Sequence, residues 1–216
     1  MTAPDWLRWH DGYDDPASSL SLRLRAVQRR VGEALDERPP GPIRVLSMCA
    51  GQGRDLIEPL LDHPRRGDVT AVLTELDERN ARIAREASAD LPGVTVLTAD
   101  AADTTAYASV VPVHLALVCG VFGNIPDEHV QGTIRRLPGL LAEGATVIWT
   151  RHRGEPDLTP AIRRWFGEVG FAEVGFDTED PHKFAVGTHR LTVPPQSYQS
   201  GLELFRFSGN GAEAAL

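Results

Sequence analysis

The chain has few cysteines and no long apolar segment. Its two cysteines, Cys49 and Cys119, are fewer than a secreted chain of this size usually needs for disulfide bridges. No stretch approaches the roughly eighteen consecutive apolar residues of a membrane span, and residues 1–15 lack the apolar centre of a signal peptide. These absences predict a cytoplasmic protein.

Positive charge and metal-ligand clusters are also scarce. The net charge is −8, and Lys183 is the only lysine beside twenty-one arginines, which are spread along the chain. Binding to phosphate backbones or anionic membranes relies on Lys and Arg, so we expect no nucleic-acid partner and no membrane partner. No group of His, Cys and carboxylates has the spacing of metal ligands, which predicts a metal-independent protein.

The residues that are present indicate one α/β domain. With 216 residues and 42% hydrophobic content the chain can bury a sizeable core, and apolar β-type runs alternate with helical patterns. We expect a doubly wound, mostly parallel seven-stranded sheet with helices on both faces and an antiparallel last strand. This core is assigned to residues 41–208, a lid segment and capping helix to 1–40, and a flexible tail to 209–216. A monomer or a homodimer is expected.

Apolar runs and helical spacing place the individual elements. The expected strands begin at Ile43 and then occupy 69–75, 94–100, 113–118 and 145–150, with closing strands at 171–176, 184–187 and 202–207. The first helix, capped by Ser18 or Ser19, carries an apolar stripe and stops at the prolines of 39–42. Further helices are expected at 55–61, 77–90, 127–141 and 158–169.

The segment from Ile43 to Glu75 has the pattern of a βαβ ligand-binding unit. Gly51 and Gly53 follow the first strand, and Glu75 ends the second. Glycines let the backbone approach a ligand, the next helix offers free N–H groups, and the acid can accept bonds from two ribose hydroxyls. Leu56 stands where a dinucleotide fold needs a third glycine, so an adenosine ligand other than a dinucleotide is favoured. Valine at either glycine is expected to abolish binding without unfolding the chain.

On these residues the chain resembles small bacterial class I S-adenosylmethionine-dependent methyltransferases, over roughly residues 40 to 207. It keeps the last two glycines of that family's loop, while Ser47 replaces the acid at its start and Cys49 replaces its first glycine. In the family this acid helps to hold the methionine amino group. Asp55, or Asp14 of the N-terminal segment, is expected to substitute for it.

Later parts of the chain extend the resemblance. Asp100 ends the third strand, where the family's acid binds the adenine amino group and the next backbone N–H faces a ring nitrogen. The run from Cys119 to Asn124 follows the fourth strand, where the family lines its methyl-transfer site. The resemblance implies S-adenosyl-L-methionine as cofactor and S-adenosyl-L-homocysteine as product. The implied cofactor-binding residues are Tyr13, Cys49, Ala50, Gly51, Gly53, Asp55, Glu75, Leu76, Asp100, Ala101, Cys119 and Gly120.

The N-terminal segment is rich in aromatic and acidic residues. Trp6, Trp9, Tyr13 and Asp14 lie before the core fold, and this composition suits a lid over a cationic cofactor, with Tyr13 against the sulfonium. The alternative is that the tryptophans pack the first helix onto the sheet.

Methyl transfer needs approach geometry, exclusion of water and, for some acceptors, a base. His152 lies between Arg151 and Arg153, which could hold an anionic substrate and lower the pKa of the imidazole. Asn124 is the second candidate at the reacting centre. Alternatively, residues 151–153 form a solvated loop and Asn124 braces its own loop.

The sequence therefore predicts a methyltransferase acting on a small molecule. O- and N-methylation are both open, and anionic or natural-product-type acceptors are candidates. The alternatives are an aminopropyl transferase-like enzyme, a protein or RNA methyltransferase, and a non-catalytic S-adenosylmethionine-binding protein. The arginines at 151 and 153 oppose a polycationic substrate, and the acidic balance opposes RNA.

Overall fold

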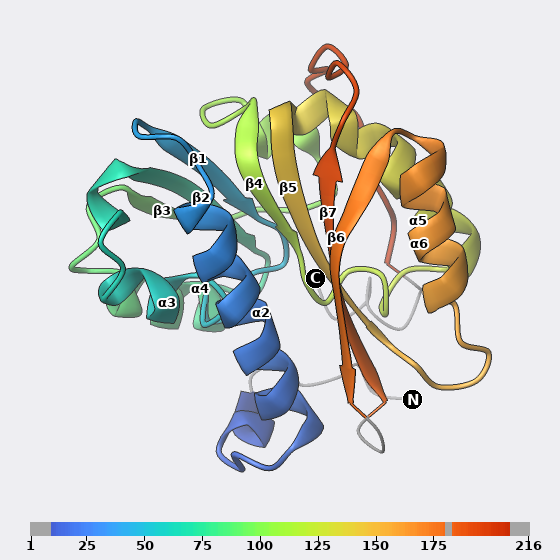
Figure 1. The fold of residues 1–216 in the computed structure, drawn as a ribbon. Coiled ribbons are helices and arrows are strands. Elements are labelled where there is room, and N and C mark those ends of the chain that lie inside the picture. Colours follow the sequence, from blue (N-terminus) through green and yellow to red (C-terminus); the bar gives the residue numbers. More distant parts are fainter. Residues whose placement is uncertain (1–9, 180–182, 208–216) are drawn as a thin grey trace.

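The computed structural model describes residues 10–179 and 183–207, and within them a single sheet runs through the molecule (Figure 1). The strands are β1 (Ile43–Ser47), β2 (Val69–Glu75), β3 (Val94–Thr98), β4 (Val113–Val118), β5 (Leu141–His152), β6 (Phe171–Glu179) and β7 (Phe184–Leu191). Their order across the sheet is β3-β2-β1-β4-β5-β7-β6. The strands β1 to β5 pair in parallel, and β7 lies antiparallel between β5 and β6. The predicted doubly wound sheet with an antiparallel last strand is confirmed.

Helices cover both faces of this sheet. The helices are α2 (Ser19–Asp36), α3 (Ile57–Leu61), α4 (Glu78–Ala87), α5 (Asp127–Arg136) and α6 (Thr159–Glu168), with short 3₁₀ helices η1 (His10–Tyr13), η2 (Arg66–Asp68), η3 (Thr104–Tyr107) and η4 (Leu137–Leu140). One core cluster joins α2, α3 and α4 to the sheet, and the other joins α5 and α6. Val45 and Leu46 show why two layers form, since these successive β1 residues belong to different clusters.

The predicted helix at 127–141 was too long. The α-helix ends at Arg136, η4 follows with Pro138, and Leu141 already begins β5. Proline has no N–H to donate to the preceding turn of an α-helix, so the chain leaves the α-helix there. The fifth strand is correspondingly longer than the predicted 145–150.

The predicted closing strand at 202–207 was wrong. The structure has no strand in that range, and Glu203 makes only an isolated antiparallel bridge with Asp103. Leu204 and Phe205 are nonetheless 1% and 3% exposed, and they join the core cluster of α5 and α6. Apolar alternation predicts a half-buried extended segment, and this one packs on the cluster without joining the sheet. We call residues 192–207 the C-terminal strap.

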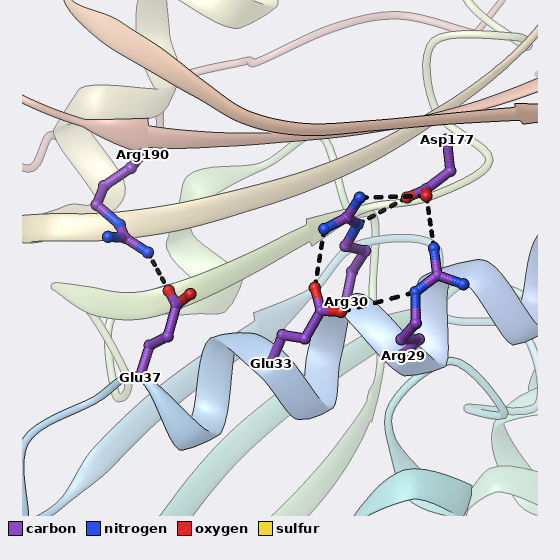
Figure 2. Close-up of polar contacts among 6 residues, drawn as sticks. All are labelled: Arg29, Arg30, Glu33, Glu37, Asp177 and Arg190. Atoms are coloured by element: carbon purple, nitrogen blue, oxygen red, sulfur yellow. Dashed lines mark hydrogen bonds and ion pairs between the residues drawn. The ribbon is translucent and has the colours of Figure 1, made fainter.

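Ion pairs join helix α2 to β6, the strand at one edge of the sheet (Figure 2). Asp177 of β6 accepts from Arg30 Nε at 2.6 Å and from Arg29 at 2.5 Å, and Glu33 pairs with both arginines. Gly175 leaves space for this contact, because a Cβ there would lie 2.5 Å from Arg30 Cζ. In Figure 1 the N-terminal end of α2 extends beyond the sheet on the side where the parallel strands end.

A buried histidine lies in the aromatic core. His189 is 1% exposed, its ring stacks on Phe166 with centroids 4.4 Å apart, and its Nδ1 accepts from Trp149 Nε1 at 3.1 Å. Its Nε2 has no hydrogen-bond partner among the described residues and lies 3.7 Å from Glu173. Burial lowers the pKa of His189 to about 4, against the opposing effect of Glu173.

This histidine should make the fold sensitive to mild acid. In the unfolded chain its pKa is near 6.5, so below that pH the unfolded state binds a proton that the folded state excludes until about pH 4. Stability should therefore fall across this window, by about 2 kcal/mol between pH 7 and pH 5. Urea unfolding of the parent and of His189→Gln at both pH values measures this, and His152→Gln at the exposed end of β5 is the control. An equal loss of stability in parent and His189→Gln would contradict it.

Candidate functional site

The predicted cofactor residues meet where the strand order reverses, between β1 and β4. The loop after β1, the end of β2, the turn after β3 and the loop after β4 all lie at the carboxyl edge of the parallel strands. Doubly wound sheets bind ligands outside this edge, because the connections on either side diverge there and leave a crevice.

The loop after β1 has three residues in the left-handed region. Cys49, Gly51 and Gly53 have φ angles of 52°, 54° and 76°. Cys49 occupies the place of the family's first glycine, and the loop keeps the left-handed conformation at this position. A residue with a side chain adopts this conformation only at an energetic cost. Ala50 N–H donates to Thr74 O at 2.9 Å, which ties the loop to β2.

Gly53 is a packing position. A Cβ there would lie 2.4 Å from Ile57 Cδ1 and 3.1 Å from Leu73 Cδ2. The absence of a side chain therefore lets α3 lie close to β2, a role that a dinucleotide fold gives to a later glycine. The expectation that valine leaves the fold intact stays a prediction for Gly51. For Gly53 the contacts and the φ angle argue that a side chain would also strain the fold.

Glu75 links the glycine loop to the end of β2. Its Oε2 accepts from Gly51 N–H at 2.7 Å and its Oε1 accepts from Asp77 N–H at 2.9 Å. Burial raises the pKa of Glu75, and these backbone bonds lower it. A carboxylate oxygen can accept more than one bond, so the group can also receive two ribose hydroxyls.

The turn after β3 and the residue after Glu75 form the adenine side of the predicted site. Asp100 is exposed, and its Oδ1 accepts from Ala102 N–H at 2.8 Å. Ala101 is buried, and its carbonyl accepts from the Tyr107 hydroxyl. Leu76 is 38% exposed, and its apolar side chain suits contact with a flat ring.

A charged cluster lies beside the loops after β1 and β4. Arg23 of α2 donates to the Tyr13 hydroxyl at 3.1 Å, and burial raises the pKa of Tyr13 to about 12. Burial also raises the pKa of Asp55, against the opposing effects of the Arg23 charge and of a hydrogen bond with Cys119. The guanidinium of Arg54 lies 5.3 Å from the centre of the Tyr13 ring.

The two acids considered for the methionine amino group differ in their position relative to this cluster. Asp55 lies with Arg23 and Cys119, whereas Asp14 is exposed. The sequence interpretation missed Arg23. The available signal was its place on α2 directly before Leu24 of the apolar stripe, which puts a charge at the border of the buried face.

The two cysteines pack on different sides of the sheet. Cys119 belongs to the cluster of α2, α3 and α4, while Cys49 packs against the cluster of α5 and α6. Burial raises the pKa of both thiols well above the usual value, so both are in the uncharged form at neutral pH.

Asn124 braces the loop after β4. Its Nδ2 donates to Gly120 O at 2.5 Å, and Gly120 N–H donates to Thr150 Oγ1 at 3.0 Å. The bracing role is the one visible in these contacts. A bond from Asn124 to a methyl acceptor stays a prediction.

His152 is exposed at the end of β5, and its Nδ1 accepts from Gly154 N–H at 2.8 Å. The hydrogen of the neutral ring is therefore on Nε2, which leaves no free lone pair for a base. Its neighbours are also engaged, since Arg151 pairs with Asp127 at 2.9 Å and Arg153 with Asp157 at 3.1 Å. A catalytic role for His152 would require the Gly154 bond to open.

Several expectations fall outside the described ranges. Trp6 and Trp9 lie there, as does the whole predicted tail at 209–216. Within residues 10–179 and 183–207, no helix is long and apolar enough to cross a membrane. The same ranges contain no group of three or more His, Cys, Asp or Glu placed to hold a metal ion.

Comparison with known proteins finds similarity in structure alone. No family model and no curated protein sequence matches the chain. Magnesium protoporphyrin IX methyltransferase from Synechocystis PCC 6803, solved with S-adenosylmethionine, superposes with a TM-score of 0.64 at 14% identity, over 86% of this chain and 90% of that one. The 1,6-didemethyltoxoflavin-N1-methyltransferase from Burkholderia thailandensis, solved with its substrate and S-adenosylhomocysteine, gives 0.64 at 15% identity, over 87% and 84%.

An N-methyltransferase from Bradyrhizobium japonicum gives a TM-score of 0.59 at 13% identity, covering 84% of this chain and 99% of that one. These similarities span nearly the whole of each protein, although few residues are shared. The chain therefore has the fold of the class I S-adenosylmethionine-dependent methyltransferases.

Proposed function

We propose that this protein is an S-adenosylmethionine-dependent methyltransferase acting on a small molecule, with S-adenosylhomocysteine as product. The observation that carries this proposal is Glu75, a partly buried acid bonded to Gly51 N–H at the crevice of a methyltransferase fold. The structural relatives act on small molecules such as magnesium protoporphyrin IX and didemethyltoxoflavin, which supports the same substrate class here.

The described residues fit the parts of this cofactor. Glu75 would accept from the ribose hydroxyls, and Asp100 would accept from the adenine amino group above the apolar surface of Leu76. Asp55 and Arg23 have the charges to hold the amino and carboxylate groups of the methionine part. The cofactor supplies an activated methyl group, so the chain itself must mainly orient the reactants and exclude water.

The charge of Arg23 also bears on the aminopropyl transferase alternative. The donor used by such enzymes lacks the carboxylate, so it could bind Asp55 through its amino group but would gain no ion pair with Arg23. A carboxylate-bearing donor is therefore favoured. Titration calorimetry with S-adenosylmethionine and its decarboxylated form, followed by methyl-transfer assays on small acceptors, tests the proposal. Absence of binding by S-adenosylmethionine and S-adenosylhomocysteine would contradict it.

The assignment of Asp55 can be tested without an acceptor. Asp55→Asn should weaken S-adenosylhomocysteine about tenfold, because a charge-assisted bond to the amino group is lost. The same variant should bind 5′-methylthioadenosine as the parent does, since that ligand lacks the amino-acid part. Calorimetry with both ligands gives the comparison, and Asp62→Asn, at an exposed position after α3, is the control. An equal loss for both ligands would show that Asp55 supports the loop as a whole.

A further inference from the structure

The C-terminal strap is hydrogen-bonded to the turn that follows β3. Leu204 N–H donates to Ala102 O at 2.8 Å, and Thr104 N–H donates to Leu202 O at 3.1 Å. Between these bonds Asp103 and Glu203 form an antiparallel bridge. The strap thus gives the turn a short two-stranded pairing, directly beside Ala101 and Asp100 of the predicted adenine side.

Thr104 is the centre of this contact. Its hydroxyl donates to Gln199 O at 2.7 Å and accepts from Leu202 N–H at 2.9 Å. Its carbonyl accepts from the Tyr198 hydroxyl at 2.7 Å. Together with its N–H bond, every polar group of Thr104 is engaged by the strap, and the residue is 1% exposed.

The strap is anchored to the domain at both ends. Gln196 N–H donates to Pro138 O at 3.2 Å, and Thr133 Oγ1 donates to Leu204 O at 3.1 Å. Between the anchors a cavity of about 220 Å³ lies beside Ser197 and Leu140. The middle of the strap is therefore held mainly by the hydrogen bonds between Thr104 and the strap, including the one from Tyr198. The same bonds hold the turn after β3 in place.

We infer that the C-terminal strap sets the selectivity of the cofactor site for adenine, with Thr104 and Tyr198 as positioning residues. This inference rests on the proposed function. Adenine offers an amino donor and a ring-nitrogen acceptor, while hypoxanthine offers an oxygen and an N–H at the same places. Asp100 and the Ala101 N–H distinguish the two bases only if the turn holds both groups in fixed register.

Dissociation constants for S-adenosylhomocysteine and S-inosylhomocysteine provide the test, and the ratio of the two is the readout. The parent should prefer the adenine ligand strongly. Thr104→Val removes the hydroxyl at nearly constant volume and should reduce the ratio about tenfold, and Tyr198→Phe should reduce it about threefold. Thr104→Ser keeps the hydroxyl and should restore the ratio, while Ser197→Ala on the same strap is the control.

The ratio separates positioning from general loss of structure, which would weaken both ligands alike. If the parent binds neither ligand, the proposed function fails. If the parent prefers adenine and both Thr104→Val and Tyr198→Phe keep its ratio, the strap does not set selectivity and this inference is overturned. Should Thr104→Val fail to fold, Tyr198→Phe alone decides, because its half-buried side chain contributes a single bond to the turn.

Discussion

Replacing Glu75 with glutamine should weaken S-adenosylhomocysteine binding more than tenfold while the protein stays folded. The carboxylate accepts from Gly51 N–H and Asp77 N–H, and in the complex it would also accept from two ribose hydroxyls. Glutamine has the same shape, but its NH₂ group cannot accept. Two charge-assisted bonds are lost or weakened, at a cost of about 2–4 kcal/mol. Titration calorimetry on the parent and the variant measures the change.

A second glutamate provides the matched control for this experiment. Glu78 begins α4 three positions after Glu75, and it pairs with Arg85 on the exposed side of that helix. Glu78→Gln removes the same charge from the same region, so its affinity should equal that of the parent. The loss of two charge-assisted bonds should weaken binding by more than about tenfold. An affinity within about threefold of the parent in a folded Glu75→Gln protein would therefore reject the ribose assignment.

The sheet could be predicted because its central strands carry their own signal. Most successive residues of β1, β2 and β4 are apolar and buried, as expected for strands covered on both faces, although the second residue of each strand is polar or charged. The run at 202–207 carries a similar signal and is no strand. Its position is set by hydrogen bonds to residues 102–104, which lie about a hundred positions earlier in the chain. A local sequence pattern cannot show such a distant contact.

The same distinction applies to the candidate site. The glycine loop and Glu75 could be predicted, since their spacing along the chain is set by one βαβ unit. For Arg23 the apolar stripe of α2 indicates only a charge at the border of the buried face, without its partners. Thr104 could not be predicted, because it acts through partners that only the folded chain brings near. For Thr104 the partner Tyr198 lies ninety-four residues away. Spacing along the chain thus places candidate residues at one edge of the sheet, and tertiary packing supplies the partners that hold them there.

Gly53→Ala should destabilise the fold itself, by about 2–4 kcal/mol, before any ligand is considered. The added Cβ would lie 2.4 Å from Ile57 Cδ1, and the φ angle of 76° is strained for any side chain. Gly32→Ala provides a control of opposite sign. Nothing lies within 4 Å of a Cβ at Gly32, which is inside α2, so alanine there should stabilise by about 0.5–1 kcal/mol. Urea unfolding without ligand measures both changes.

A double variant tests whether the contact with Ile57 is the cause. Ile57→Val removes the Cδ1 atom that the new Cβ would meet, so it should cost about 1 kcal/mol in the parent and less in Gly53→Ala. The strain from the φ angle would remain, and the rescue should be partial. A Gly53→Ala protein that is as stable as the parent but does not bind S-adenosylhomocysteine would reverse the assignment. Gly53 would then be kept free of a side chain by the cofactor, and its closeness to Ile57 and Leu73 would be incidental.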